Sequence, residues 1–274
     1  KILNQKPGKS GRKTATKINS ILTEAGKRLN HDAQLIAAVR SARNVVLPLR
    51  FTLGNSGADD SQQLSAWLKI NSIELNSVPQ SQGLLKGNPN GFRGIFNKHR
   101  IQASGLIEPY LDLSKKAGAL GHINLIGDTD GTVRKLPLFI TYQDRDFISF
   151  ALQVARKYAG GRLKEIEHTQ DKVILRQLQI PTEKNHRMLI DYSGRKANIQ
   201  QISFADVING QVDLNIFRRK VVLIGVTADG ISQHYNTPTG SNVSGLEIEA
   251  TAIENIINGK HISRPAWVFL SEIL

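Results

Sequence analysis

The stretch RRKVVLIGVTADG, residues 218–230, gives the strongest strand signal in the chain and decides the fold class that we expect. Five of the six residues between Lys220 and Thr227 are apolar, and an Asp-Gly pair follows them. A near-continuous apolar run of this length is typical of a strand that is buried on both faces, in the middle of an α/β sheet. We therefore predict a central strand at residues 221–226.

A long helix is predicted after the loop that follows this strand. The sequence LEIEATAIENIINGK, residues 246–260, has apolar residues at the period of an amphipathic helix. Ser244 precedes Glu247 by three positions, which is the spacing of a capping box. The predicted apolar face consists of Leu246, Ala250, Ile253 and Ile257. We expect this face to cover the central sheet.

The remaining sequence indicates a mixture of helices and strands within a single domain, residues 1–264. Residues 54–100 are rich in Gly, Asn, Ser and Pro, and they indicate a long surface excursion with one short helix at residues 64–70. The expected fold class is α/β, with a mixed, largely central sheet flanked by helices. Further helices are predicted at residues 14–30, 32–42, 105–118, 146–161 and 203–210, and further strands at residues 44–51, 122–127, 132–142, 172–180 and 187–192.

The charge of the chain is concentrated at one end. The formal net charge is +13, and residues 1–50 contain 11 Lys and Arg against 2 Asp and Glu. Such an end is suited to contact with phosphate backbones or anionic lipids, so a basic nucleic-acid-binding module is one hypothesis. These basic residues are interleaved with apolar residues at helical spacing, and we favour solvated helix faces.

Two aspartates lie one residue apart in GDTDGTVRK, residues 127–135, directly after an apolar run. The pattern D-x-D-G-T after a strand is how dehalogenase-like phosphatases begin, so a magnesium-dependent phosphatase that uses Asp128 and Asp130 is a second hypothesis. A magnesium site needs further carboxylates, and only Asp229 follows the later strand. Asp-Gly between apolar runs is a strong turn signal, and we favour a hairpin corner.

No catalytic residue, cofactor or metal ion is expected elsewhere. Cysteine is absent, which excludes disulfides, thiolate metal sites and thiol chemistry within the chain. Neither G-x-S-x-G nor H-E-x-x-H occurs, and the seven histidines lack the spacing of metal ligands. We therefore expect a protein that is not an enzyme.

Two long stretches carry a resemblance to a known family. Residues 117–140 contain the pattern G-h-x-N-x-x-x-D-x-D-G-x-x-R. Residues 217–262 combine an apolar strand that ends in Ile-Gly, a Thr-Pro pair in the next loop, and the helix pattern G-x-E-I-x-A-x-A-I-x-N-I-I-x-G. In order, spacing and composition these stretches resemble the second type of CHASE domain, and residues 32–51 resemble it less specifically.

The resemblance implies the extracytoplasmic sensor domain of a membrane-bound bacterial receptor, located at the periplasmic face of the inner membrane. It implies flanking transmembrane helices and a cytoplasmic cyclase or kinase effector in the same chain. The expected partners are an unidentified small-molecule or periplasmic signal and a second copy of the chain in a homodimer, and not nucleic acid. The family offers no catalytic residue to carry over.

Both ends of the chain carry further expectations. Domains of this type usually begin with a strand and an acidic segment that have no counterpart here, so we expect the N-terminal strand to be lacking. The segment RPAWVFLSEIL, residues 264–274, ends the chain with a Pro, a Trp and a short apolar run. We expect residues 265–274 to approach or begin a transmembrane helix, because Trp is favoured at the membrane interface.

A ligand site is predicted from two loops that follow strands, because ligands of α/β proteins favour such loops. The first loop contributes Asp128, Asp130 and Arg134, and the second contributes Asp229, His234 and Thr237. The residues SQHY before Asn236 depart from the family, which commonly has an acidic residue there. This departure changes the chemistry that the second loop offers to a ligand.

Overall fold

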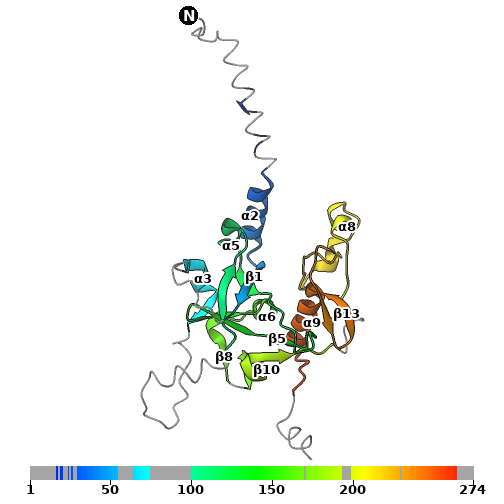
Figure 1. Cartoon of the computed structure of the whole chain (residues 1–274). Coiled ribbons are helices and arrows are strands. Elements are labelled where there is room, and N and C mark those ends of the chain that lie inside the picture. Colours follow the sequence, from blue (N-terminus) through cyan, green and yellow to red (C-terminus); the bar gives the residue numbers. More distant parts are fainter. Residues whose placement is uncertain are drawn as a thin grey trace, which may run out of the picture.

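The computed structural model describes residues 30–54, 64–74, 100–169, 171–192, 199–228 and 230–263, together with residues 17, 19, 20, 24 and 26. Within these residues, helices alternate with five small sheets, so the predicted α/β class is confirmed. Figure 1 shows one lobe around β1 and α6 and a second lobe around α9 and β13, from which α8 projects.

The first lobe contains a three-stranded sheet in the order β3-β1-β4. The central strand β1 (Val46–Leu53) pairs antiparallel with β3 (Ala103–Ile107) and parallel with β4 (Ala119–His122). The helix α2 (His31–Ala42) leads into β1, and the short helix α5 (Leu111–Ser114) leads into β4. The sheet of this lobe therefore joins a central strand to two edge strands that lie about 50 residues or more later in the sequence.

A second sheet, in the order β2-β7-β6, packs against the first. The hairpin of β6 (Phe139–Tyr142) and β7 (Arg145–Ile148) receives β2 (Ser72–Glu74) on its outer side, and α3 (Ala66–Ile70) precedes β2. Apolar side chains from both sheets form a continuous core between them. Its buried members are Leu49, Phe51, Leu68, Ala103, Leu120, Ile140, Tyr142 and Phe147.

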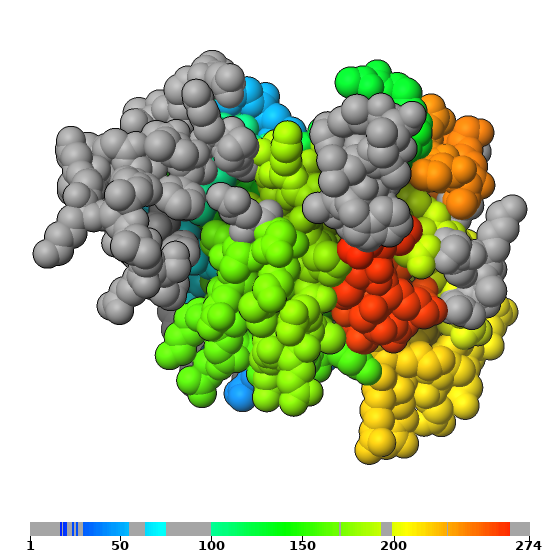
Figure 2. All heavy atoms as spheres, turned by 90° about the horizontal axis from the view of Figure 1, so that it is seen from below, coloured from blue at the N-terminus to red at the C-terminus, as the bar shows by residue number. Residues whose placement is uncertain are grey.

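A larger core joins the two lobes, and its centre is the contact between α6 (Phe150–Tyr158) and α9 (Gly245–Asn258). Three short ladders surround these helices. They are the meander of β8 (Ile166–His168), β9 (Lys172–Leu175) and β10 (Leu178–Pro181), the pair of β5 (Lys135–Pro137) with β11 (Arg187–Leu189), and the pair of β12 (His234–Thr237) with β13 (Gly240–Ser244). Figure 2 shows the meander beside the end of α9.

Short helical elements complete the description. They are η2 (Leu163–Glu165), η3 (Lys184–His186), α8 (Phe204–Ile208) and η4 (Leu214–Phe217). The predictions for residues 14–30 and 54–100 fall largely outside the described residues, and the prediction for residues 265–274 falls wholly outside them.

The long predicted helix is present, and its ends lie close to the predicted ones. The Oγ atom of Ser244 accepts a hydrogen bond from the backbone N–H of Glu247, and Gly259 ends α9 with a φ of 64°. Its buried face is centred on Ile248, Ala252 and Ile256, so the predicted face is displaced around the helix. The displacement arises because α9 packs on α6 and not on a central sheet.

The predicted central strand at residues 221–226 is wrong. Residues 221–227 make no backbone–backbone hydrogen bond with any residue that the structure describes. Val221 and Leu223 pack against the larger core, whereas the side chains between them face solvent. Val222, Ile224 and Val226 are 48%, 78% and 55% exposed. The apolar run is covered on one face only, although its composition suits burial on both.

Other predicted elements are also wrong. The single strands predicted at residues 132–142 and 172–180 are each two strands in the structure. Residues 105–107 belong to β3 and not to a helix, and the strand predicted at residues 122–127 lies earlier and ends at His122. The helix predicted from residue 146 begins at Phe150, because the Oγ atom of Ser149 accepts from the backbone N–H of Leu152 and caps it. In these places helix-like spacing and short apolar runs did not identify the element type.

Gly121→Ala is expected to lower the free energy of unfolding by ~1–3 kcal/mol, the usual cost of overpacking. A Cβ atom at Gly121 would lie 2.7 Å from the Cα atom of Phe150, so β4 and α6 could not keep their contact. Urea unfolding measures the change. Gly105→Ala is the matched control, because its nearest neighbours, the Cβ and Oγ1 atoms of Thr52, lie at 3.5 Å. Equal destabilisation by both variants would contradict the close packing.

Candidate functional site: the aspartate corner

The chain turns sharply between β4 and β5, and we name residues 127–134 the aspartate corner. The backbone N–H of Asp128 donates to the carbonyl of Thr132 at 2.9 Å, and that of Gly131 donates to the carbonyl of Asp128 at 2.8 Å. Gly131 has a φ of 75°, which glycine adopts without strain. The predicted turn is confirmed, but the predicted hairpin is wrong. The two arms of the turn do not pair with each other, because β4 pairs with β1 and β5 pairs with β11.

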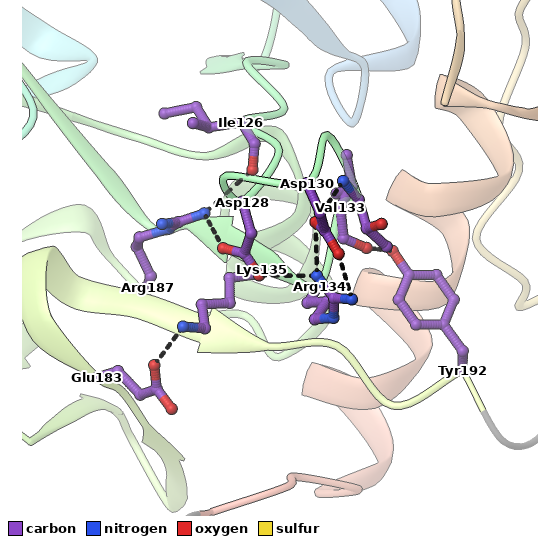
Figure 3. Close-up of polar contacts among 10 residues, drawn as sticks. Ile126, Asp128, Asp130, Val133, Arg134, Lys135, Glu183, Arg187 and Tyr192 are labelled. Carbon is purple, nitrogen blue, oxygen red and sulfur yellow. Dashed lines mark hydrogen bonds and ion pairs between the residues drawn. The ribbon is translucent and has the colours of Figure 1, made fainter. Parts of the chain in front are cut away.

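Asp130 and Arg134 form a bidentate ion pair across the corner. Arg134 donates from Nη1 to Oδ1 of Asp130 at 2.9 Å and from Nη2 to Oδ2 at 2.7 Å. The backbone N–H of Thr132 also donates to Oδ1 at 3.0 Å. The bonds from Arg134 and then from Thr132 hold the pKa of Asp130 well below its ordinary value. The carboxylate of Asp130 is therefore ionised at neutral pH and fixes the shape of the turn (Figure 3).

Asp128 lies between two guanidinium groups. Its Oδ2 atom is 3.4 Å from Nη1 of Arg134, and its Oδ1 atom is 3.5 Å from Nη2 of Arg187. The same Nη2 atom of Arg187 donates to the carbonyl of Ile126 at 3.0 Å. Since Arg187 is the first residue of β11, these contacts tie the corner to the strand that pairs with β5 (Figure 3).

A further ion pair extends this network along β5. Lys135 lies 2.7 Å from Glu183, measured between Nζ and Oε2. The network then contains three carboxylates and three cations, so its formal charges cancel. The carboxylates are Asp128, Asp130 and Glu183, and the cations are Arg134, Lys135 and Arg187. A balanced network of this kind holds strands together, and a charged ligand enters it only by exchange with one of its members.

The structure brings part of the second predicted loop against the corner. Thr132 forms a parallel bridge with Asn236, and the backbone N–H of Val133 donates to the carbonyl of Asn236 at 2.8 Å. Thr237 is buried, and its Oγ1 donates to the carbonyl of Gly240 at 2.9 Å. His234 is partly buried, and its Nε2 atom lies 3.3 Å from the Oγ atom of Ser232. Asp229 lies outside the described residues.

The sequence did not identify Arg187 and Tyr192 as parts of the site, and it did not predict that Asn124 ties the preceding segment to β1. Asn124 donates from Nδ2 to the carbonyl of Phe51 and accepts from its N–H at Oδ1, so the amide extends the edge of β1. Tyr192 donates its hydroxyl to the carbonyl of Val133 at 2.8 Å, and Arg187 completes the set. The N in the family pattern G-h-x-N-x-x-x-D-x-D-G-x-x-R is Asn124, so the sequence carried a signal for this residue. The sequence offers no comparable signal for Arg187 or Tyr192, which are distant in the chain.

The geometry favours a structural junction with one accessible polar pair. In the described part of the chain, no cluster of three or more His, Asp or Glu side chains is suited to hold a metal ion. Asp128 contacts two arginines, which stabilise its charge. The exposed Asp130–Arg134 pair is open to competition by an outside ion, because the side chains are 52% and 39% exposed.

Arg134→Ala is expected to lower the free energy of unfolding, because it removes a bidentate pair and leaves Asp128 with one cation. Chemical denaturation measures the change. The control is Arg162→Ala, which removes the exposed ion pair between Nε of Arg162 and Oε1 of Glu165, 3.8 Å apart. Its loss is expected to lower the free energy of unfolding by less than ~0.5 kcal/mol. If the two variants lose the same stability, the corner does not act as a junction.

Comparison with known proteins identifies the family. The model of the CHASE2 domain matches residues 9–274, which is nearly the whole chain. No curated protein and no solved structure matches the chain. None of the helices in the described segments is both long and apolar enough to cross a membrane.

Proposed function

The chain belongs to the CHASE2 domain family, a family of extracytoplasmic sensor domains, and on that premise we propose that it detects a signal outside the cytoplasm and relays it through the membrane. The match over residues 9–274 is the observation that carries this proposal. The family is one of sensors and not of catalysts, so the proposal contains no reaction and no cofactor.

The proposed receptor contains the domain at the periplasmic face of the inner membrane, transmembrane helices in the same chain, and a cytoplasmic cyclase or kinase. The domain changes its conformation or the arrangement of a dimer when the signal binds. A ligand shifts such a receptor only by its different affinity for the two states. The ligand must therefore contact a part of the domain that differs between them.

We place the signal-binding site at the aspartate corner and the adjoining β12. The support for this placement is the exposed Asp130–Arg134 pair, which an anionic ligand enters by replacing Asp130 at the guanidinium. Because Arg134 also contacts Asp128, the exchange alters the junction between the corner and β11. The proposed ligand-binding residues remain Asp128, Asp130, Arg134, Asp229, His234 and Thr237.

The test measures effector output of the full-length receptor in membranes. Arg134→Ala is expected to change basal or signal-dependent output several-fold, whereas Arg162→Ala is expected to leave it unchanged. Arg134→Lys keeps the charge and loses the bidentate geometry, so it should give an intermediate output. If both alanine variants are folded and both respond as the parent receptor does, the placement of the site is wrong.

A further inference from the structure

Residues 221–227 form an exposed apolar segment, which we name the apolar edge. Its side chains alternate between two environments. Val221 and Leu223 pack on the larger core, and Val222, Ile224 and Val226 face solvent. This alternation is the two-residue period of a β-strand with one covered face. The three exposed residues are β-branched, which is the class that strands favour.

The apolar edge is held in position by its own inner face. A Cβ atom at Gly225 would lie 3.1 Å from both Cδ atoms of Leu246, so the backbone rests directly on the first turn of α9. In the described structure, the backbone groups of residues 221–227 make no hydrogen bond to other backbone groups. A positioned segment with apolar side chains, whose backbone groups have no backbone partner among the described residues, is suited to pair with an added strand.

We propose that the apolar edge pairs antiparallel with the same segment of a second copy of this chain, with Ile224 opposite its own counterpart. A twofold axis through this point makes the two surfaces self-complementary, as a symmetric dimer requires. Val222 of each copy then lies opposite Val226 of the other. The three exposed side chains of each copy meet on one face of the shared ladder.

The basic residues before the apolar edge favour antiparallel over parallel pairing. Arg218, Arg219 and Lys220 precede the apolar edge, and all three are exposed. A parallel pair would place these six cations side by side, and like charges directly opposite each other are destabilising. The antiparallel pair separates the two basic groups to opposite ends of the ladder. The antiparallel arrangement is therefore the one that the surface permits.

The contact is small, and the dimer should be weak in solution. A ladder of seven residues per copy lies below the usual size of a stable interface, so we expect a Kd on the order of 10 μM or weaker. Exposed apolar residues elsewhere in the same lobe, Phe204, Ile208 and Leu214, offer additional area. The inference rests on this surface alone and does not depend on the sensor assignment.

The absence of cysteine permits a direct test of the register. Ile224→Cys introduces a single thiol into the chain. Opposed residues of an antiparallel pair have Cβ atoms ~4.5–5.5 Å apart, close enough for a disulfide after small adjustment. Under mild oxidation, Ile224→Cys should form a covalent dimer at least ten times faster than Ile70→Cys, a control residue that is 75% exposed on α3.

A mixture of two variants fixes the direction of the pairing. Val222→Cys and Val226→Cys should cross-link with each other and much more slowly with themselves. Sedimentation velocity should show a concentration-dependent dimer for the unmodified chain and a monomer for Ile224→Asp, with circular dichroism to verify folding. The proposal is overturned by a monomer at all concentrations, or by a dimer in which Ile224→Cys links no faster than Ile70→Cys.

Discussion

Glu249→Gln is expected to become more stable relative to the parent protein as the pH rises from about 5 to 8. Glu249 is 4% exposed on α9, and neither carboxyl oxygen makes a hydrogen bond of normal geometry. Burial raises its pKa from 4.5 to about 8, and the backbone N–H of Ala151 opposes this only in part. The carboxyl group is therefore neutral in the folded protein at neutral pH.

The sign of the pH dependence follows from this raised pKa. Well below pH 4.5 the carboxyl group is protonated in both the folded and the unfolded state, so Glu249 adds no pH dependence to stability there. Between 4.5 and about 8 the unfolded state releases its proton and the folded state keeps it, so stability falls with rising pH. The total loss is on the order of 3–5 kcal/mol, since one pKa unit corresponds to about 1.4 kcal/mol.

Urea unfolding at several pH values between 5 and 9 measures this effect. The free energy of unfolding of Glu249→Gln minus that of the parent protein should increase from pH 5 to about 8, because this difference cancels the contribution of the buried histidines, whose pKa values are lowered by burial. Glu167→Gln, on the exposed part of β8, is the control and should follow the parent protein. An identical pH profile for the parent and Glu249→Gln would show that Glu249 is ionised or solvated in the folded protein.

Asp146→Ala is expected to lower the free energy of unfolding by about 3–5 kcal/mol, the cost of leaving a buried charge without its partner. Asp146 is 2% exposed on β7, where it pairs with Arg100 and accepts a hydrogen bond from the Oγ1 atom of Thr141 at 2.6 Å. The side chain of Arg100 is only 11% exposed. Without Asp146, the guanidinium of Arg100 either stays buried without a counter-charge or moves into solvent and exposes the core beside β6.

Denaturant unfolding of three variants separates the possible causes. Asp130→Ala removes an exposed pair and should cost much less stability than Asp146→Ala. The double variant Arg100→Met with Asp146→Leu should recover much of the stability lost in Asp146→Ala, because two apolar residues replace a buried pair at little cost. If Asp146→Ala and Asp130→Ala are equally stable, the pair of Arg100 with Asp146 is solvated and not part of the core.

The elements that were predicted well have local causes. The Ser244 cap and the turn at Gly131 each depend on residues within a few positions of one another. The predicted central strand failed because its burial depends on which segments lie beside it, and composition does not report that. The strand predicted at residues 122–127 failed for a similar reason, since pairing with β1 ends at His122.

The candidate site was also predicted only in part: its local residues were identified, and its distant ones were not. Asp128, Asp130 and Arg134 belong to one short pattern, and the structure joins them through ion pairs. Arg187 approaches the corner from a strand that is 59 positions from Asp128 in the sequence. Such long-range partners can be predicted only once the pairing of the strands is known. Whether a ligand binds among these residues stays a prediction.

Labelling of intact cells tests the central claim most directly. In a full-length receptor whose only cysteine is Ile70→Cys, a membrane-impermeant maleimide should label residue 70 from outside, once the outer membrane is permeable. Ile148→Cys is the matched control, because Ile148 is fully buried and should react only after denaturation. The sensor account predicts rapid labelling of Ile70→Cys before the inner membrane is broken. Protection of Ile70→Cys until the cells are lysed would place the domain in the cytoplasm and contradict the account.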